Sequence, residues 1–276
     1  METEKKTLQL TSDGDLSEQI KLVTKESHVR AENTELMLTF QRGKVTLQQY
    51  KLLLCSMYKI YQALEDLMER NSDHPGVAPV YFPAELARLS AIEADLQFFY
   101  GQNWREKIVV PAATERYCHR LRQIGDENPG LLVAHAYTRY LGDLSGGQVL
   151  GRIAQKSMGL KSREGLSFFE FPGVSSPNLF KQLYRSRMNS VELTEEERKA
   201  VLDEAVRAFE FNIQVFDDLQ KMLSITESQK QDCSTYSRLV KMLPLDGTMS
   251  KTIPLLRVGL GIFLALATVS MGVYAL

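Results

Sequence analysis

The sequence predicts an all-α protein. Across its 276 residues, stretches rich in Leu, Glu, Lys, Arg and Gln dominate, only nine prolines interrupt them, and strand-like alternation is hard to find. Hydrophobic residues make up 44% and charged residues 24%, as in an ordinary globular protein with a buried core. The net charge of −1 gives no global indication of a nucleic-acid partner.

Most of these helices are expected in one domain, residues 16–223, which follows a flexible N-terminal segment, residues 1–15. Apolar residues at helical spacing predict helices at 16–40, 46–69, 83–100, 104–124 with an interruption at Pro111, 128 onward through a glycine-rich segment, 179–190 and 194–223.

The helix that begins at Asn128 contains three glycines within six residues, Gly142, Gly146 and Gly147. Each costs roughly 1 kcal/mol relative to alanine in a helix interior, so about 2–3 kcal/mol of helix stability is lost here. Together with Asp143 they are expected to share one side of the helix. Bare backbone around a single carboxylate indicates that something approaches closely. Close packing of a second helix and a ligand-binding wall both remain open.

A polar column on the first predicted helix contains a candidate metal ligand, His28. Lys21, Thr24, His28 and Glu32 follow one another at spacings of three and four, which places them on adjacent turns. Glu32 could hold the imidazole ring, as carboxylates do for metal-bound histidines. A solvated histidine is the alternative.

Residues 150–190 hold seven basic residues against two acidic ones, although the whole chain is nearly neutral. This local excess favours an acidic partner or an anionic ligand, but scattered surface charge explains it equally well. The basic residues are Arg152, Lys156, Lys161, Arg163, Lys181, Arg185 and Arg187.

The cysteines and the two chain ends bear on the compartment. Cys55, Cys118 and Cys233 form no zinc or disulfide pattern, and no signal peptide is evident, which predicts a cytosolic catalytic part. Residues 224–253 predict a flexible linker. Residues 254–276 include nineteen uncharged residues, about 28 Å as a helix, which predicts a C-terminal transmembrane helix and a tail-anchored protein.

Several segments resemble the eukaryotic heme oxygenases. The segment 132–148, LVAHAYTRYLGDLSGGQ, is similar to the family's signature, and further similarity lies in HVRAEN (28–33), APVYFP (78–83), FKQLYRSRMNS (180–190) and the apolar tail. The resemblance spans residues 16–223 and the tail. It implies one helical domain that sandwiches heme b between a proximal helix and the glycine-rich distal helix.

The resemblance also implies roles for individual residues. His28 would be the axial ligand of the heme iron, and Asp143 would order distal water. The residues at the heme propionates would be Lys21, Tyr137, Lys181 and Arg185. The distal helix would cover the heme with Gly142, Gly146 and Gly147. The hydrogen-bonding surroundings of Asp143 would be Tyr61, Arg139, Tyr117 and Asn212, whereas His135 would be structural.

Two departures from the family pattern are visible. Ala87 stands where mammalian members carry a histidine, so one distal hydrogen-bonding group is missing. The Cys-Pro pairs of the constitutive isoform are absent, since Ser234 follows Cys233, and this favours resemblance to the inducible isoform.

The implied activity is oxidative cleavage of heme at a meso carbon, with heme as both cofactor and substrate. Dioxygen would be consumed, and biliverdin, carbon monoxide and ferrous iron released. Electrons would come from NADPH through a diflavin reductase of the endoplasmic reticulum membrane, docked at a basic patch around Arg152 and Arg187. A non-catalytic heme-binding or heme-sensing protein is the alternative, although such a protein has no need for Asp143. A di-iron enzyme is disfavoured because paired Glu-x-x-His motifs are missing.

Overall fold

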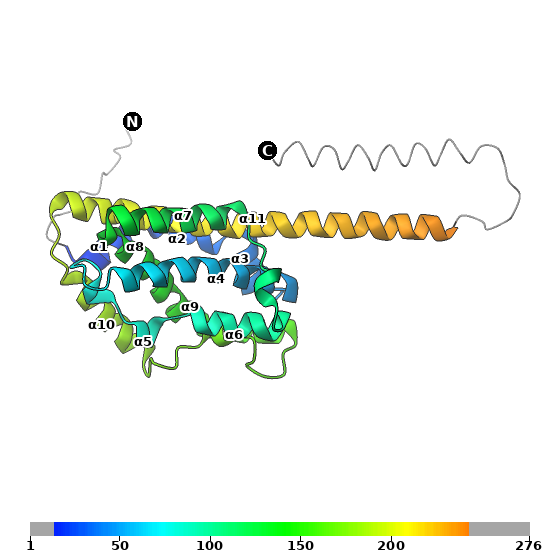
Figure 1. Ribbon diagram of the computed structural model, residues 1–276, viewed down its shortest axis with the longest axis horizontal. Coiled ribbons are helices and arrows are strands. Elements are labelled where there is room, and N and C mark those ends of the chain that lie inside the picture. Colours follow the sequence, from blue (N-terminus) through cyan, green and yellow to red (C-terminus); the bar gives the residue numbers. More distant parts are fainter. Residues whose placement is uncertain (1–13, 243–276) are drawn as a thin grey trace, which may run out of the picture. The chain divides into compact units, whose positions relative to one another are not determined.

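A computed structural model describes residues 14–242 of the chain, and side chains as far as Ser224. This part is helical and contains no strand, which confirms the predicted fold class (Figure 1). Two compact units are distinguished, Met1–Thr226 and Glu227–Leu276, and the contacts described below lie in the first. The elements are α1 (Leu16–Val23), α2 (Lys25–Glu32), α3 (Glu35–Gln41), α4 (Leu47–Arg70), η1 (Ala78–Val80), α5 (Pro83–Leu86), α6 (Leu89–Tyr100), η2 (Trp104–Lys107), α7 (Ala112–Glu127), η3 (Pro129–Leu131), α8 (Leu132–Ala136), η4 (Tyr137–Leu141), α9 (Gly142–Met158), η5 (Ser167–Phe169), α10 (Pro177–Asn189) and α11 (Glu195–Met242).

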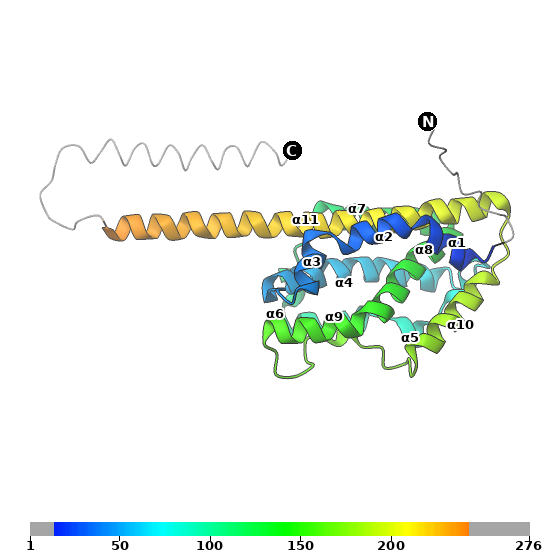
Figure 2. The ribbon, with the colours of Figure 1, turned by 180° about the vertical axis from the view of Figure 1, so that it is seen from behind.

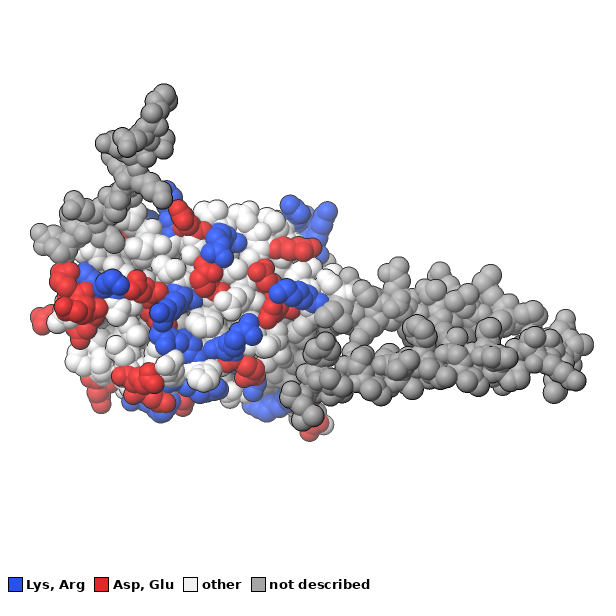
Figure 3. All heavy atoms as spheres, turned by 90° about the horizontal axis from the view of Figure 1, so that it is seen from above, with Lys and Arg blue, Asp and Glu red and all other residues white. Residues whose placement is uncertain are grey.

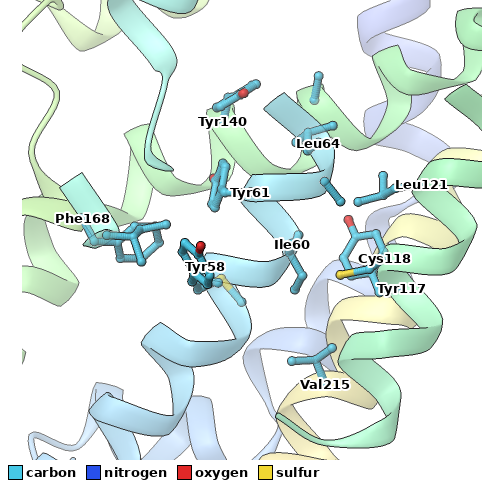
Figure 4. Close-up of a cluster of buried hydrophobic side chains, with 14 of the residues drawn as sticks. Tyr58, Ile60, Tyr61, Leu64, Tyr117, Cys118, Leu121, Tyr140, Phe168 and Val215 are labelled. Atoms are coloured by element: carbon cyan, nitrogen blue, oxygen red, sulfur yellow. The ribbon is translucent and has the colours of Figure 1, made fainter. Parts of the chain in front are cut away.

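Helix α4 is the centre of the domain, because 14 of its 24 residues are buried. It begins at a capping box, in which Thr46 and Gln49 each accept a hydrogen bond from the other's backbone N–H, at 3.2 and 2.8 Å. Figure 4 shows Tyr117 and Cys118 of α7 on one side of α4 and Phe168 on the other. The core therefore surrounds α4, and the two cysteines described, Cys55 and Cys118, are buried free thiols as expected.

The prediction of a single helix over 16–40 was wrong, because the chain forms three short helices there. Hydroxyl and amide side chains at the two breaks bond to carbonyls of the preceding turn, an alternative to continuing the helix. Thr24 donates to the Ile20 carbonyl at 2.7 Å, and Thr34 donates to the Ala31 carbonyl at 2.9 Å. The region 83–100 is likewise divided, at Ala87, into α5 and α6.

The helix predicted to begin at Asn128 is also divided, into η3, α8, η4 and α9. In contrast, the expected interruption at Pro111 is confirmed, since Pro111 immediately precedes α7.

Helix α11 extends further than predicted. It continues to Met242, so the prediction of a flexible linker from residue 224 was wrong as far as that residue. The reason is that no glycine or proline follows until Pro244. The predicted membrane anchor, 254–276, lies outside the described residues. Within 14–242, no helix combines the length and the apolar character that a membrane span requires.

Candidate active site

The residues singled out in the sequence lie mainly on four helices, α1, α2, α9 and α10. All four helices lie on the face of the molecule that is turned toward the viewer in Figure 2. Helix α10 is fixed to the N-terminal part of the fold, because the Ser17 backbone N–H donates to the Asn189 side chain at 2.9 Å. The face seen in Figure 2 therefore carries α2 with His28, the glycine-rich helix α9, and α10 with its basic residues.

A π-helical turn, η4, connects α8 to the glycine-rich helix α9. Such a turn inserts one residue relative to an α-helix and is frequent at functional sites. In this chain it buries Arg139, Tyr140 and Leu141 just before Gly142. The sequence analysis missed the turn, since the apolar spacing of 133–144 reads as a regular helix.

The glycines of α9 fall into two groups with different surroundings. A Cβ added at Gly142 would meet nothing within 4 Å, and one at Gly146 would meet only Leu150 of the next turn, at 3.8 Å. A Cβ at Gly147 would instead lie 3.6 Å from Phe169 of η5. The expectation that all three glycines share one side was therefore wrong for Gly147, which at about 100° per residue lies about 140° around the helix from Gly142. Gly147 therefore serves close packing, whereas Gly142 and Gly146 border open space and form what is called the open wall below.

Asp143 lies beside this open wall at the centre of a hydrogen-bond network. Arg139 Nη2 donates to both carboxylate oxygens, at 2.8 and 2.7 Å, and the Tyr61 hydroxyl donates to Oδ2. Arg139 Nη1 donates to Asn212 at 2.7 Å, and Asn212 in turn donates to the Ala208 carbonyl of α11 at 2.7 Å. The structure thus brings together four predicted site residues from three parts of the chain. The Asp143 side chain remains 17% exposed, so it is still accessible from the open wall.

Burial and charge determine the protonation of the groups around Asp143. Burial raises the pKa of Tyr61, and the Asp143 carboxylate raises it further. Burial alone would lower the pKa of Arg139, but the charge of Asp143 outweighs it and the pKa is raised. Tyr61 and Arg139 therefore act as permanent donors that orient Asp143, and neither can serve as a base. The Arg139 Nε is buried without a hydrogen-bond partner in the described residues.

Tyr117 contacts this network from the other side and also reaches His135. Burial raises the pKa of Tyr117, and a hydrogen bond from the Asn212 side chain counteracts the rise. The Tyr117 hydroxyl lies 3.2 Å from His135 Nδ1, and His135 Nε2 lies 3.0 Å from Glu204 Oε1. Arg120 binds the same carboxylate at 2.9 and 2.6 Å. His135 therefore ties α7, α8 and α11 together, which agrees with the structural role expected for it.

Glu204 is a residue that the sequence analysis missed. Its side chain is only 2% exposed, yet it remains ionised. Burial would raise its pKa, but hydrogen bonds from His135 and Arg120 lower the pKa to about 2. Burial in turn lowers the pKa of His135, so the imidazole is neutral and its Nε2–H donates to the carboxylate. Glu204 could have been recognised in the sequence as a carboxylate that falls within the apolar stripe of Val201 and Ala205.

His28 is exposed on α2. Its Nδ1 lies 3.7 Å from Glu32 Oε1, so the predicted pair is adjacent but longer than a hydrogen bond. The ring meets the edge of Phe209 of α11 at 5.6 Å between centroids. Among the side chains described, no group of three or more His, Cys, Asp or Glu residues could hold a metal ion.

Basic side chains flank this region. Lys181 and Arg185, one turn apart on α10, form no ion pair among the described residues, whereas Lys21 lies 3.5 Å from Glu18. The neighbouring Tyr184 packs 6.5 Å from Tyr137 of η4, between ring centroids, which places α10 beside the π-helical turn. Unpaired cations of this kind suit carboxylate groups of a ligand.

Ala87, the departure from the family pattern, lines a cavity of about 210 Å³ together with Glu65 and Tyr140. Glu65 accepts the Arg88 and Leu89 backbone N–H groups at 2.5 and 3.3 Å, and burial raises its pKa. The ring centroids of Tyr140 and Tyr61 are 5.7 Å apart. Figure 4 shows the two side chains as neighbours. A histidine at position 87 would therefore border the cavity that Tyr140 also lines, and the Tyr140 ring is in turn next to Tyr61.

The fold and the site together define a class: a domain that is helical throughout its described residues, with an exposed imidazole, an open glycine wall beside an oriented carboxylate, and cations at the rim. A family model described as heme oxygenase matches residues 14–218. The chain is 73% identical to "Heme oxygenase" of Takifugu rubripes, over the full length of both chains. It is 49% identical to "Heme oxygenase 1" of Homo sapiens, over 95% of this chain and 96% of that protein.

A solved structure agrees with these relatives. The heme complex of heme oxygenase-1 from the cyanobacterium Synechocystis sp. PCC6803 is 40% identical and superposes with a TM-score of 0.72, covering 79% of this chain and all of that one. The chain belongs to the heme oxygenase family.

Proposed function

We propose that the protein is a heme oxygenase that cleaves heme at a meso carbon and releases biliverdin, carbon monoxide and ferrous iron. The observation that carries the proposal is the oriented Asp143 carboxylate beside the bare backbone of Gly142 and Gly146. A protein that only binds heme requires the open wall but not the carboxylate.

The residues present fit heme. Gly142 and Gly146 leave space where any other side chain would project, which suits a flat ring lying against the helix. His28 would bind the iron through Nε2, with Glu32 close to Nδ1. The carboxylates of the ligand would be held by Lys21, Tyr137, Lys181 and Arg185. Bound heme supplies an iron centre that activates dioxygen and the carbon that is oxidised.

The protein's own contribution at the open wall is orientation and proton supply. Arg139 and Tyr61 hold the Asp143 carboxylate at a fixed angle, so that it can order water above the ligand and pass on a proton. Asn212 fixes Arg139 in turn. The glycine backbone would limit which edge of the ligand is accessible, and thereby which meso carbon can be oxidised.

Electrons would reach the site from NADPH through a diflavin reductase that docks at Arg152 and Arg187. Both arginines are exposed, on α9 and α10 respectively, and the sequence around them is locally basic. By contrast, the face over α7 and α11 intersperses acidic and basic side chains (Figure 3). Residues 254–276 would anchor the chain in the endoplasmic reticulum membrane, with the catalytic domain in the cytosol.

Incubation of the purified protein with heme, NADPH and the reductase tests the proposal. Loss of the Soret band and appearance of biliverdin are expected. A stable Soret band in the complete mixture would instead identify a non-catalytic heme-binding protein. The His28→Ala variant tests iron ligation without turnover, since it should lose the absorption spectrum of heme whose iron is bound by an imidazole.

A further inference from the structure

Helix α2, which carries His28, has almost no apolar anchorage. Only one of its eight residues, Ser27, is buried, and Val29 is 52% exposed. The neighbouring α1, of the same length, buries Leu16 and Ile20. Because hydrophobic burial contributes so little, polar contacts must determine where α2 lies on the domain.

Those contacts converge on one carboxylate, Glu210 of α11. Both terminal nitrogens of Arg30 donate to it, Nη2 at 3.1 Å from Oε2 and Nη1 to Oε1, and the Ser27 hydroxyl lies 3.4 Å from Oε1. The preceding residue of α11, Phe209, meets the His28 ring. One turn of α11 therefore contacts three positions of α2, and a two-pronged Arg–Glu pair fixes direction as well as distance.

The side chains at the two ends of α2 do not hold its middle against α11. Thr24 and Asn33 end helices α1 and α2 through bonds to their own preceding turns, at 2.7 Å each. The side-chain bond from α3 to α2 is that of Gln41 to the Glu32 carbonyl, at 3.0 Å, and it holds only the C-terminal end. In the middle of α2, where His28 lies, the polar side-chain contacts to α11 are those with Glu210, beside the ring contact with Phe209.

We propose that Glu210 is a positioning residue that holds α2 against α11 through Arg30 and Ser27, and so sets the place of the His28 imidazole relative to the glycine wall. The clamp itself is independent of any ligand. Its consequence for iron ligation rests on the proposed function.

Hydrogen exchange of the full-length, ligand-free chain tests the clamp directly. In Glu210→Gln the α2 amides should exchange about fivefold faster, whereas those of α4 should not change. Arg30→Lys keeps the charge but loses the two-pronged geometry, and it should give an intermediate increase. The matched control is Glu93→Gln, which removes the Arg105–Glu93 pair of 2.8 Å. That pair has exposures of 62% and 34%, against 57% and 34% for Arg30–Glu210. It should leave α2 unchanged.

The iron–histidine stretching band of the heme-loaded ferrous protein is the second measurement. It should shift or broaden in Glu210→Gln and not in Glu93→Gln. Unchanged exchange in α2, or faster exchange throughout α4 and α7, would overturn the clamp. If the α2 amides of Glu210→Gln exchange faster but its iron–histidine band is unaltered, the positioning role is overturned, provided that His28→Ala abolishes the band. If His28→Ala keeps the band, the proposed iron ligand is wrong, and faster exchange confined to α2 still supports the clamp.

Discussion

Replacing Gly142 by alanine should have opposite effects on two properties: it should raise the stability of the ligand-free protein and lower its affinity for heme. A Cβ there meets no atom within 4 Å, and the backbone is already helical, with φ −61°. Alanine is favoured over glycine in a helix by about 1 kcal/mol, and nothing in the described structure offsets that gain. The ligand-free Gly142→Ala protein should therefore unfold about 2–4 °C higher than the parent chain.

The same methyl group would project from the open wall into the space assigned to heme. We expect the heme dissociation constant to rise about 5- to 150-fold, since a forced steric contact of this kind costs about 1–3 kcal/mol. Thermal unfolding without heme and spectrophotometric heme titration measure the two effects separately.

Gly147→Ala is the matched control, because it makes the same helix-favouring change 3.6 Å from Phe169 and away from the open wall. It should leave heme affinity within about twofold of the parent chain. If Gly142→Ala binds heme as tightly as Gly147→Ala does, heme does not lie against Gly142, and the open wall has been wrongly interpreted.

Three further changes have defined outcomes. Asp143→Asn should still bind heme but form biliverdin at least about 100-fold more slowly, measured by the loss of the Soret band, because it cannot supply a proton. The free energy of unfolding, measured in urea across pH, should fall by about 3 kcal/mol as pH drops from 4.5 to 2. The cause is the titration of Glu204, whose pKa is lowered to about 2 only in the folded state. The Glu204→Gln variant should lack this fall in stability. Ala87→His should change the free energy of unfolding by less than about 1 kcal/mol, because the cavity of about 210 Å³ accommodates the ring. A calorimetric unfolding temperature far below that of the parent chain would contradict this prediction.

Much of the fold was predictable because helical periodicity is a local property of the sequence. Helix α4 and the start of α7 after Pro111 follow from spacing and from residues at the helix ends. The breaks at Thr24 and Thr34 did not, because a threonine can either continue a helix or bond back to the preceding turn, and tertiary packing decides between the two.

The site was predictable in its residues but not in its connections. Resemblance to the family identified Asp143 and Arg139, but the bond from Arg139 to Asn212 joins residues 73 positions apart. Glu204 and His135 are 69 positions apart, and Arg30 and Glu210 are 180 apart. Spacing along the chain carries no information about such pairs. The expected shared side for Gly147 failed for a different reason, since a spacing of five residues already places Gly147 about 140° around the helix from Gly142.

Three local costs coincide in the segment 137–147, and their coincidence is an argument for function. The π-helical turn departs from regular helix geometry, Arg139 is buried with an unpaired Nε, and the glycines weaken the helix. Packing against Phe169 accounts for Gly147, but the structure described offers no packing partner that requires glycine at 142 or 146. Because violations of local rules concentrate where function demands them, the cost at those two positions is best explained by a ligand that the described chain does not itself supply.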